Sequence, residues 1–119
     1  MANKTTISTG LAWTDGKDTI RGSSALVVTQ VGDNVIFNLQ TIGTSAAEAL
    51  DLGDVTPGYV FFKNEDETNF IEIGNTVGLS VVAAKLIPGQ GVMIPTTTTA
   101  WFAKADTAPA LLQVLAVDA

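Results

Sequence analysis

Short turn motifs divide this chain at intervals of about eight to twelve residues, a spacing that is typical of an all-β sandwich or barrel. Gly, Pro, Asp and Asn concentrate at the breaks, and these residue types favour tight turns. The breaks stand at Asp15-Gly16, Gly32-Asp33-Asn34, Gly53-Asp54, Pro57-Gly58, Pro88-Gly89-Gln90-Gly91 and Asp106 to Pro109. We therefore predict an all-β chain of about eight to nine strands. We predict no helix; residues 44–50 are the only segment with some helical propensity, and they allow at most a single helical turn.

The segment after the second break shows the alternation of a strand. Val35, Phe37 and Leu39 share one face, whereas Asn38 and Gln40 share the other. Nearly all the connections are short, as in antiparallel hairpins. Two packed antiparallel sheets satisfy this pattern economically. Jelly-roll order is one option, and the sequence leaves the strand order open.

Two predicted strands depart from this alternation, because they are apolar on both faces. In residues 111–117, one face carries Leu111, Leu115 and Val117, and the opposite face carries Leu112, Val114 and Ala116. Residues 81–87, which begin with Val81, are similar, and Lys85 is their only charged residue. A sandwich strand normally buries one face. The second apolar face is therefore covered either by another subunit or by the protein's own loops. Self-association is the functional interpretation, with a trimer as one candidate.

Pairs of adjacent aromatic residues also suggest an interface with a partner. Alternation places Phe61 opposite Phe62, and Trp101 opposite Phe102. One member of each pair must therefore leave the core or meet a partner. Aromatic side chains are favoured anchors at protein interfaces. The candidate interface residues are Leu111, Leu115, Val117, Val81, Trp101 and Phe61.

The composition bounds the size of the protein and the nature of its surface. At 119 residues, the chain has the length of one domain, and we predict a single sandwich domain over residues 1–119. Charged residues make up 15% of the chain, against roughly 25% in typical soluble domains. Such a surface suits a protein that packs against neighbours, although a neutral β-domain surface explains it equally well.

Several classes of function are disfavoured by what the chain lacks. It has no Cys and no His, which removes thiolate chemistry, the commonest general base and the usual transition-metal ligand. The net charge is −6 with only six basic residues, so binding to nucleic acid or to an anionic membrane is not expected. The acidic run Glu65-Asp66-Glu67 lacks the spacing of a calcium loop and predicts a solvated hairpin tip. We predict no catalytic residue, no metal and no cofactor, and hence not an enzyme.

Targeting signals are equally sparse. The first six residues lack the apolar core of a signal peptide. No apolar run approaches the ~18 residues of a membrane helix. We therefore expect the protein to be made in the cytoplasm and to stay soluble or be assembled there.

Three motifs in the second half of the chain carry a resemblance. They are Gly58-Tyr59-Val60-Phe61-Phe62-Lys63-Asn64 with Asn69-Phe70-Ile71-Glu72-Ile73-Gly74, then Leu86-Ile87-Pro88-Gly89, then Phe102-Ala103-Lys104-Ala105. Over residues 57–117 the chain resembles small proteins encoded among the virion genes of tailed bacteriophages. The resemblance implies a β-sandwich protein of the virion.

Within that resemblance, a capsid decoration (cement) protein that binds the major capsid protein is the leading expectation. A tail, fibre or head–tail joining module is the alternative with the same location. A carbohydrate-binding host-attachment module using Trp13, Trp101 or Tyr59 is the alternative from another class.

Overall fold

The computed structural model describes residues 4–14, 16–17, 19–29, 35–53, 55, 57–96 and 98–118. Ten strands and one short 3-10 turn, η1 (Val77–Leu79), make up the regular structure of this part of the chain. The all-β prediction is confirmed. Residues 44–50, the segment with some helical propensity, form no helical turn: residues 44–46 are bends and β4 (Glu48–Ala49) follows them.

The chain divides into two compact units, Met1–Asp33 and Asn34–Ala119. The first unit is a hairpin of β1 (Lys4–Thr14) and β2 (Thr19–Thr29), paired antiparallel along their whole length. The second unit contains the sandwich. The prediction of one domain over residues 1–119 stays a prediction, and each unit is described separately below.

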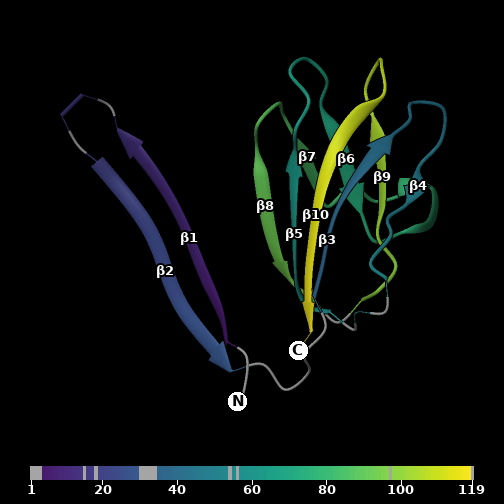
Figure 1. Cartoon of the computed structure of the whole chain (residues 1–119). Helices are drawn as coiled ribbons and strands as arrows, with labels where there is room; N and C mark the ends of the chain where they lie inside the picture. Colours follow the sequence, from purple (N-terminus) through teal and green to yellow (C-terminus); the bar gives the residue numbers. More distant parts are fainter. Residues whose placement is uncertain are drawn as a thin grey trace. The chain divides into compact units, whose positions relative to one another are not determined.

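The second unit is a sandwich of two four-stranded antiparallel sheets. The first sheet has the order β3 (Val35–Ile42), β10 (Ala110–Asp118), β5 (Pro57–Asn64), β8 (Gly91–Pro95). The second has the order β4, β9 (Phe102–Ala105), β6 (Ile71–Gly74), β7 (Ala84–Leu86). In Figure 1, β10 runs between β3 and β5, with β8 beyond β5 at the sheet edge.

This strand order identifies the type of sandwich. The first and last strands of the unit, β3 and β10, are neighbours, and strands that follow one another in sequence mostly belong to opposite sheets. Eight strands connected in this way form the two Greek keys of a jelly roll. The predictions of an antiparallel sandwich and of jelly-roll order are therefore both confirmed.

Apolar side chains from both sheets fill the space between them. The first sheet contributes Ile42, Val60, Phe62, Leu112, Val114 and Ala116, and the second contributes Ile71, Ile73, Leu86, Ala103 and Ala105. Trp101 joins this core just before β9, with its ring centroid 5.6 Å from that of Phe62. Its indole Nε1 donates a hydrogen bond to the Thr98 carbonyl at 3.1 Å, so the one polar atom of the ring is satisfied.

The predicted strand at residues 81–87 is much shorter than expected, because only Ala84–Leu86 pairs as β7. Val81 lies in a loop whose backbone is held by the Thr76 hydroxyl, which accepts a hydrogen bond from the Val81 N–H at 2.9 Å. This loop passes so close to Gly74 that a Cβ atom there would collide with the Val81 carbonyl. Val81 therefore does not belong to a strand with two apolar faces.

Candidate functional site

The outer surface of the first sheet carries apolar side chains on all four of its strands, with Thr41, Gln113 and Lys63 as polar positions among them. We call this surface the apolar sheet face. Its members are Val35, Phe37 and Leu39 of β3, Leu111, Leu115 and Val117 of β10, Tyr59 and Phe61 of β5, and Met93 of β8. Their strand neighbours, such as Phe62 and Leu112, are fully buried in the core. Strand alternation therefore directs these side chains away from the core.

Strand register gathers these side chains into rows. The central row crosses the sheet as Phe37, Leu115, Phe61 and Met93, each directly opposite the next. Directly opposed side chains lie about 5 Å apart at Cβ, so this row is a continuous apolar ridge. Phe37 is 60% exposed at the β3 edge of the ridge.

A glycine on β8 shapes the middle of the apolar sheet face. A Cβ atom on Gly91 would lie 2.9 Å from Phe61 Cζ and 3.1 Å from Phe61 Cε2. The outer edge of the Phe61 ring therefore occupies the space that a side chain on Gly91 would need. This packing explains why Phe61 is only partly exposed although it points outward.

The outer surface of the second sheet has the opposite character. Glu72 of β6 stands between Lys85 of β7 and Lys104 of β9 in the strand register. The Lys85 ammonium lies 4.1 Å from the centroid of the Phe70 ring, a cation–π contact. Opposite charges in one row across a sheet suit an exposed, solvated surface. The sandwich therefore has one charged and one apolar outer surface.

Charge is nearly absent from the apolar sheet face. Among the described outward positions of that sheet, Lys63 is the only charged residue. Its Nζ lies 3.5 Å from Oε1 of Glu65, and both side chains are partly exposed. A pair of this kind adds little stability in water. A partner that covers the apolar sheet face would have to desolvate this one ion pair and a few uncharged polar groups, among them those of Thr41 and Gln113.

The size of the apolar sheet face is that of a functional surface patch. Its strands have eight, nine, eight and five residues, and at ~3.3 Å per residue and ~4.8 Å between strands they cover roughly 480 Å². This is near the upper end of the apolar patches found on monomeric proteins, which are often functional. Covering this area is worth at most about 12 kcal/mol at ~25 cal/mol per Å². The cost of association, about 4–15 kcal/mol, takes up much of that figure.

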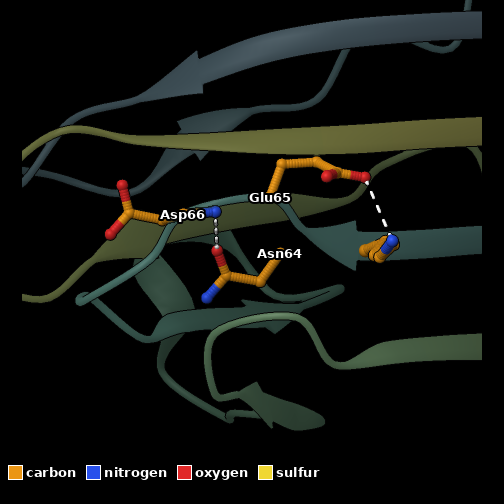
Figure 2. Close-up of polar contacts among 4 residues, drawn as sticks. Asn64, Glu65 and Asp66 are labelled. Atoms are coloured by element: carbon orange, nitrogen blue, oxygen red, sulfur yellow. Dashed lines mark hydrogen bonds and ion pairs between the residues drawn. The ribbon is translucent and has the colours of Figure 1, made fainter.

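The acidic tip between β5 and β6 is a structural turn. Figure 2 shows the carboxylates of Glu65 and Asp66 pointing away from each other, as predicted for a hairpin tip. Beneath them Asn64 is fully buried, and its Nδ2 donates to the Asn69 carbonyl at 2.7 Å and the Leu86 carbonyl at 2.9 Å. Its Oδ1 accepts from the Asp66 N–H at 2.9 Å. Asn64 therefore ties three separate segments together.

Asp66 completes this turn as an acceptor. Its Oδ2 accepts the N–H of Asn69 at 2.6 Å and that of Thr68 at 3.0 Å. The Asn69 N–H first, and the Thr68 N–H second, lower the pKa of the Asp66 carboxyl below its usual value. The carboxylate therefore stabilises the turn, and its hydrogen bonds to Thr68 and Asn69 account for its position without a metal ion.

The structure brings part of the predicted interface together. Leu111, Leu115, Val117 and Phe61 all lie on the apolar sheet face. Trp101, in contrast, is only 3% exposed in the core, so its side chain is not available to a partner. This corrects the assignment of Trp101, and it is Phe102 that turns toward the other side of β9.

Val81 lies elsewhere. It is 62% exposed, but it belongs to the loop before β7 of the second sheet and not to the apolar sheet face. It therefore does not join the other predicted interface residues in one surface.

Sequence reasoning left Val35, Phe37, Leu39 and Met93 out of the candidate interface. The alternation of residues 35–40 correctly grouped the three β3 residues on one face. It could not show that this face points outward, while Ile36 on the opposite side packs against the core. The apolar side of β3 is thus its exposed side, and an apolar strand face turned outward is the signal of a docking surface.

Neither a metal site nor a known relative provides another interpretation. The described part of the chain contains no group of three or more Asp or Glu side chains placed to hold a metal ion. No helix of this part is long and apolar enough to cross a membrane. No family model, curated protein or solved structure matches the chain.

Proposed function

We propose that this chain is a structural protein of a tailed-phage particle, a capsid decoration protein that docks on the major capsid protein through its apolar sheet face. The observation that carries the proposal is the contrast between the two outer surfaces of the sandwich. One is apolar from Phe37 to Met93, and the other carries Glu72, Lys85 and Lys104. A protein in a surface layer needs one side that contacts the lattice and one that faces water.

The mechanism is adhesion without chemistry. Burial of the apolar sheet face across a junction of shell subunits favours the assembled shell over its free parts, because the protein binds only the assembled state. The phage assignment itself is supported by the resemblance over residues 57–117. The buried position of Trp101 removes one of the aromatic residues considered for a sugar-binding platform.

Shell binding provides the test. Empty shells of the major capsid protein from the same genome are mixed with the purified chain, sedimented, and heated until they break. Wild type should sediment with the shells and raise the temperature at which they break. Phe37→Glu, which places a charge on the apolar sheet face, should do neither. Ala49→Glu adds the same charge at an exposed position of the second sheet and should behave as wild type.

Two results would contradict the proposal. One is wild-type protein that stays in the supernatant and leaves the shells equally fragile. The other is a copy number of tens or fewer in the mature particle, which would instead favour a tail, fibre or joining module.

A further inference from the structure

The β1–β2 hairpin has an apolar side that its own unit does not cover. Strand register places Ile7 opposite Leu26, and Leu11 opposite Gly22, on the same side of the hairpin. Leu11 is 80% exposed and Leu26 is 54% exposed. A two-stranded hairpin alone is marginally stable in water, and an apolar sheet side needs a second layer. We therefore expect a second layer to cover this side when the hairpin is folded.

Gly22 is placed where the hairpin itself has no need of a glycine. Its φ is not among the positive values found in this chain. A Cβ atom added to it would meet nothing within 4 Å. A glycine inside a strand costs roughly 0.5–1 kcal/mol relative to alanine. Such a glycine often marks the place where another backbone or side chain approaches closely.

We propose that the hairpins of two copies of this chain pack face to face across a two-fold axis, through the side that carries Leu11 and Gly22. Leu11 of each copy then lies over Gly22 of the other. The argument for a second copy is shape. Among the described side chains on this side, Leu11 is the most exposed apolar one, and it stands directly opposite Gly22, which has no side chain. In a two-fold interface, residue i of one copy meets residue j of the other and the reverse, so a projection beside a gap is complementary to itself.

Charge favours the same occupant. The described side chains on this side of the hairpin are uncharged, and Thr9 and Ser24 hydrogen-bond each other through their hydroxyls at 2.9 Å. Residues 1–33 contain three basic and three acidic residues, so the net charge of −6 belongs entirely to residues 34–119. Two hairpins can therefore meet without net repulsion, whereas two sandwich units repel each other.

The size of the contact predicts its strength. Strands of eleven residues at ~3.4 Å per residue and a width of ~10 Å give roughly 370 Å² per copy. This is about half of the ~800 Å² per partner in a standard interface. The pair is therefore weak, and it should form in proportion to protein concentration.

Sedimentation of the full-length protein from about 1 µM to about 1 mM tests the pairing. Wild type should pass from monomer to dimer. Gly22→Val fills the gap and Leu11→Ala removes the projection, so each should weaken the dimer about tenfold or more. Gly10→Val is the matched control, because Gly10 lies on the other side of the hairpin and a Cβ there meets only the Gly22 carbonyl at 3.8 Å. It should pair as wild type does.

A second measurement remains informative if a variant disturbs the hairpin. The chain has no Cys, so Leu11→Cys and Gly22→Cys proteins can be mixed in a glutathione redox buffer. A disulfide between the two variants should dominate, because it needs Cα atoms within about 7 Å. Gly10→Cys mixed with Leu11→Cys should link far less.

The pairing would be overturned by a wild-type protein that is monomeric throughout, or by an oligomer that tolerates Gly22→Val. Equal cross-linking of Gly10→Cys and Gly22→Cys would also overturn it. Shell binding is measured on the full-length chain and is tested by Phe37→Glu, a change in the sandwich unit, so this inference and the proposed function can fail separately.

Discussion

Two phenylalanines on different strands of the first sheet provide the sharpest test of which side of that sheet is the inside. Phe62 on β5 is fully buried, and Phe37 on β3 is 60% exposed. The perturbation is the same in both cases, truncation to alanine. If the apolar sheet face points outward as described, Phe62→Ala must cost far more stability than Phe37→Ala in the isolated protein.

The magnitudes follow from burial. Truncation of a buried phenylalanine costs about 3–5 kcal/mol, because transfer and cavity terms add. Phe62→Ala also removes the contact between the Phe62 and Trp101 rings, whose centroids are 5.6 Å apart. This favours the upper end of the ~3–5 kcal/mol range. The part of the Phe37 side chain that is kept out of water is ~80 Å², which at ~25 cal/mol per Å² is worth about 2 kcal/mol. The expected difference between the two variants is therefore about 1–3 kcal/mol.

Urea unfolding followed by tryptophan fluorescence measures this difference. The chain has two Trp residues, so a Trp13→Phe background leaves Trp101 as the single reporter in the core. At an m-value of about 1.5 kcal/mol/M, Phe62→Ala should lower the midpoint by roughly 2–3 M, and Phe37→Ala by about 1 M. Equal midpoints, or a larger loss for Phe37→Ala, would refute the assignment of the apolar sheet face to the outside.

Three further results are expected. Asn64→Ala should lower the free energy of unfolding by about 3–5 kcal/mol in denaturant titrations, because two buried carbonyls and one N–H lose their hydrogen-bond partner. In the control, Asn75→Ala at an exposed position should change this free energy by less than about 0.5 kcal/mol. Equal losses in the two variants would refute the role of Asn64. The pKa of Asp66 is lowered in the folded state, so its stabilising effect is present above the unfolded pKa and is lost as the pH falls through the folded one. The melting temperature of Asp66→Asn should therefore lie below that of wild type at pH 7, with the gap closing below about pH 4; a gap that does not vary with pH would contradict this. Gly91→Ala should displace the Phe61 ring from its 2.9 Å approach and cost about 1–3 kcal/mol, and this loss should largely disappear in a Phe61→Ala background; additive losses in the double-mutant cycle would show that the two residues do not touch.

The alternation of β3 shows how far sequence reasoning reaches. Period-two spacing depends only on the geometry of the strand, so it correctly placed Val35, Phe37 and Leu39 on one side. The turn motifs likewise predicted most strand positions, because Gly, Pro, Asp and Asn act on the local backbone. Prediction failed where contacts with other parts of the fold overrode the local pattern. Residues 81–83 are apolar enough for a strand, yet hydrogen bonding to Thr76 and close approach to Gly74 make them a loop.

The candidate site was predicted only in part, for a related reason. Leu115 and Phe61 were identified because their neighbours in sequence, Val114 and Phe62, were equally apolar, so one side of each strand had to lie outside the core. Trp101 met the same criterion, but it occupies the core while Phe102 turns outward. Nothing in a pair of adjacent aromatic residues says which of the two faces inward, since that depends on the sheet packed opposite.

By itself, the sequence determined that this chain forms strands, that the strands are antiparallel, and that some carry two apolar sides, because these features follow from residue types and spacings along a few neighbouring positions. The tertiary structure alone decided which apolar side became the core. Strands such as β3 and β10, distant in the chain, are adjacent in one sheet. Only that pairing turns scattered outward residues into one continuous surface, because a docking surface is a property of strand order and register and not of any single strand.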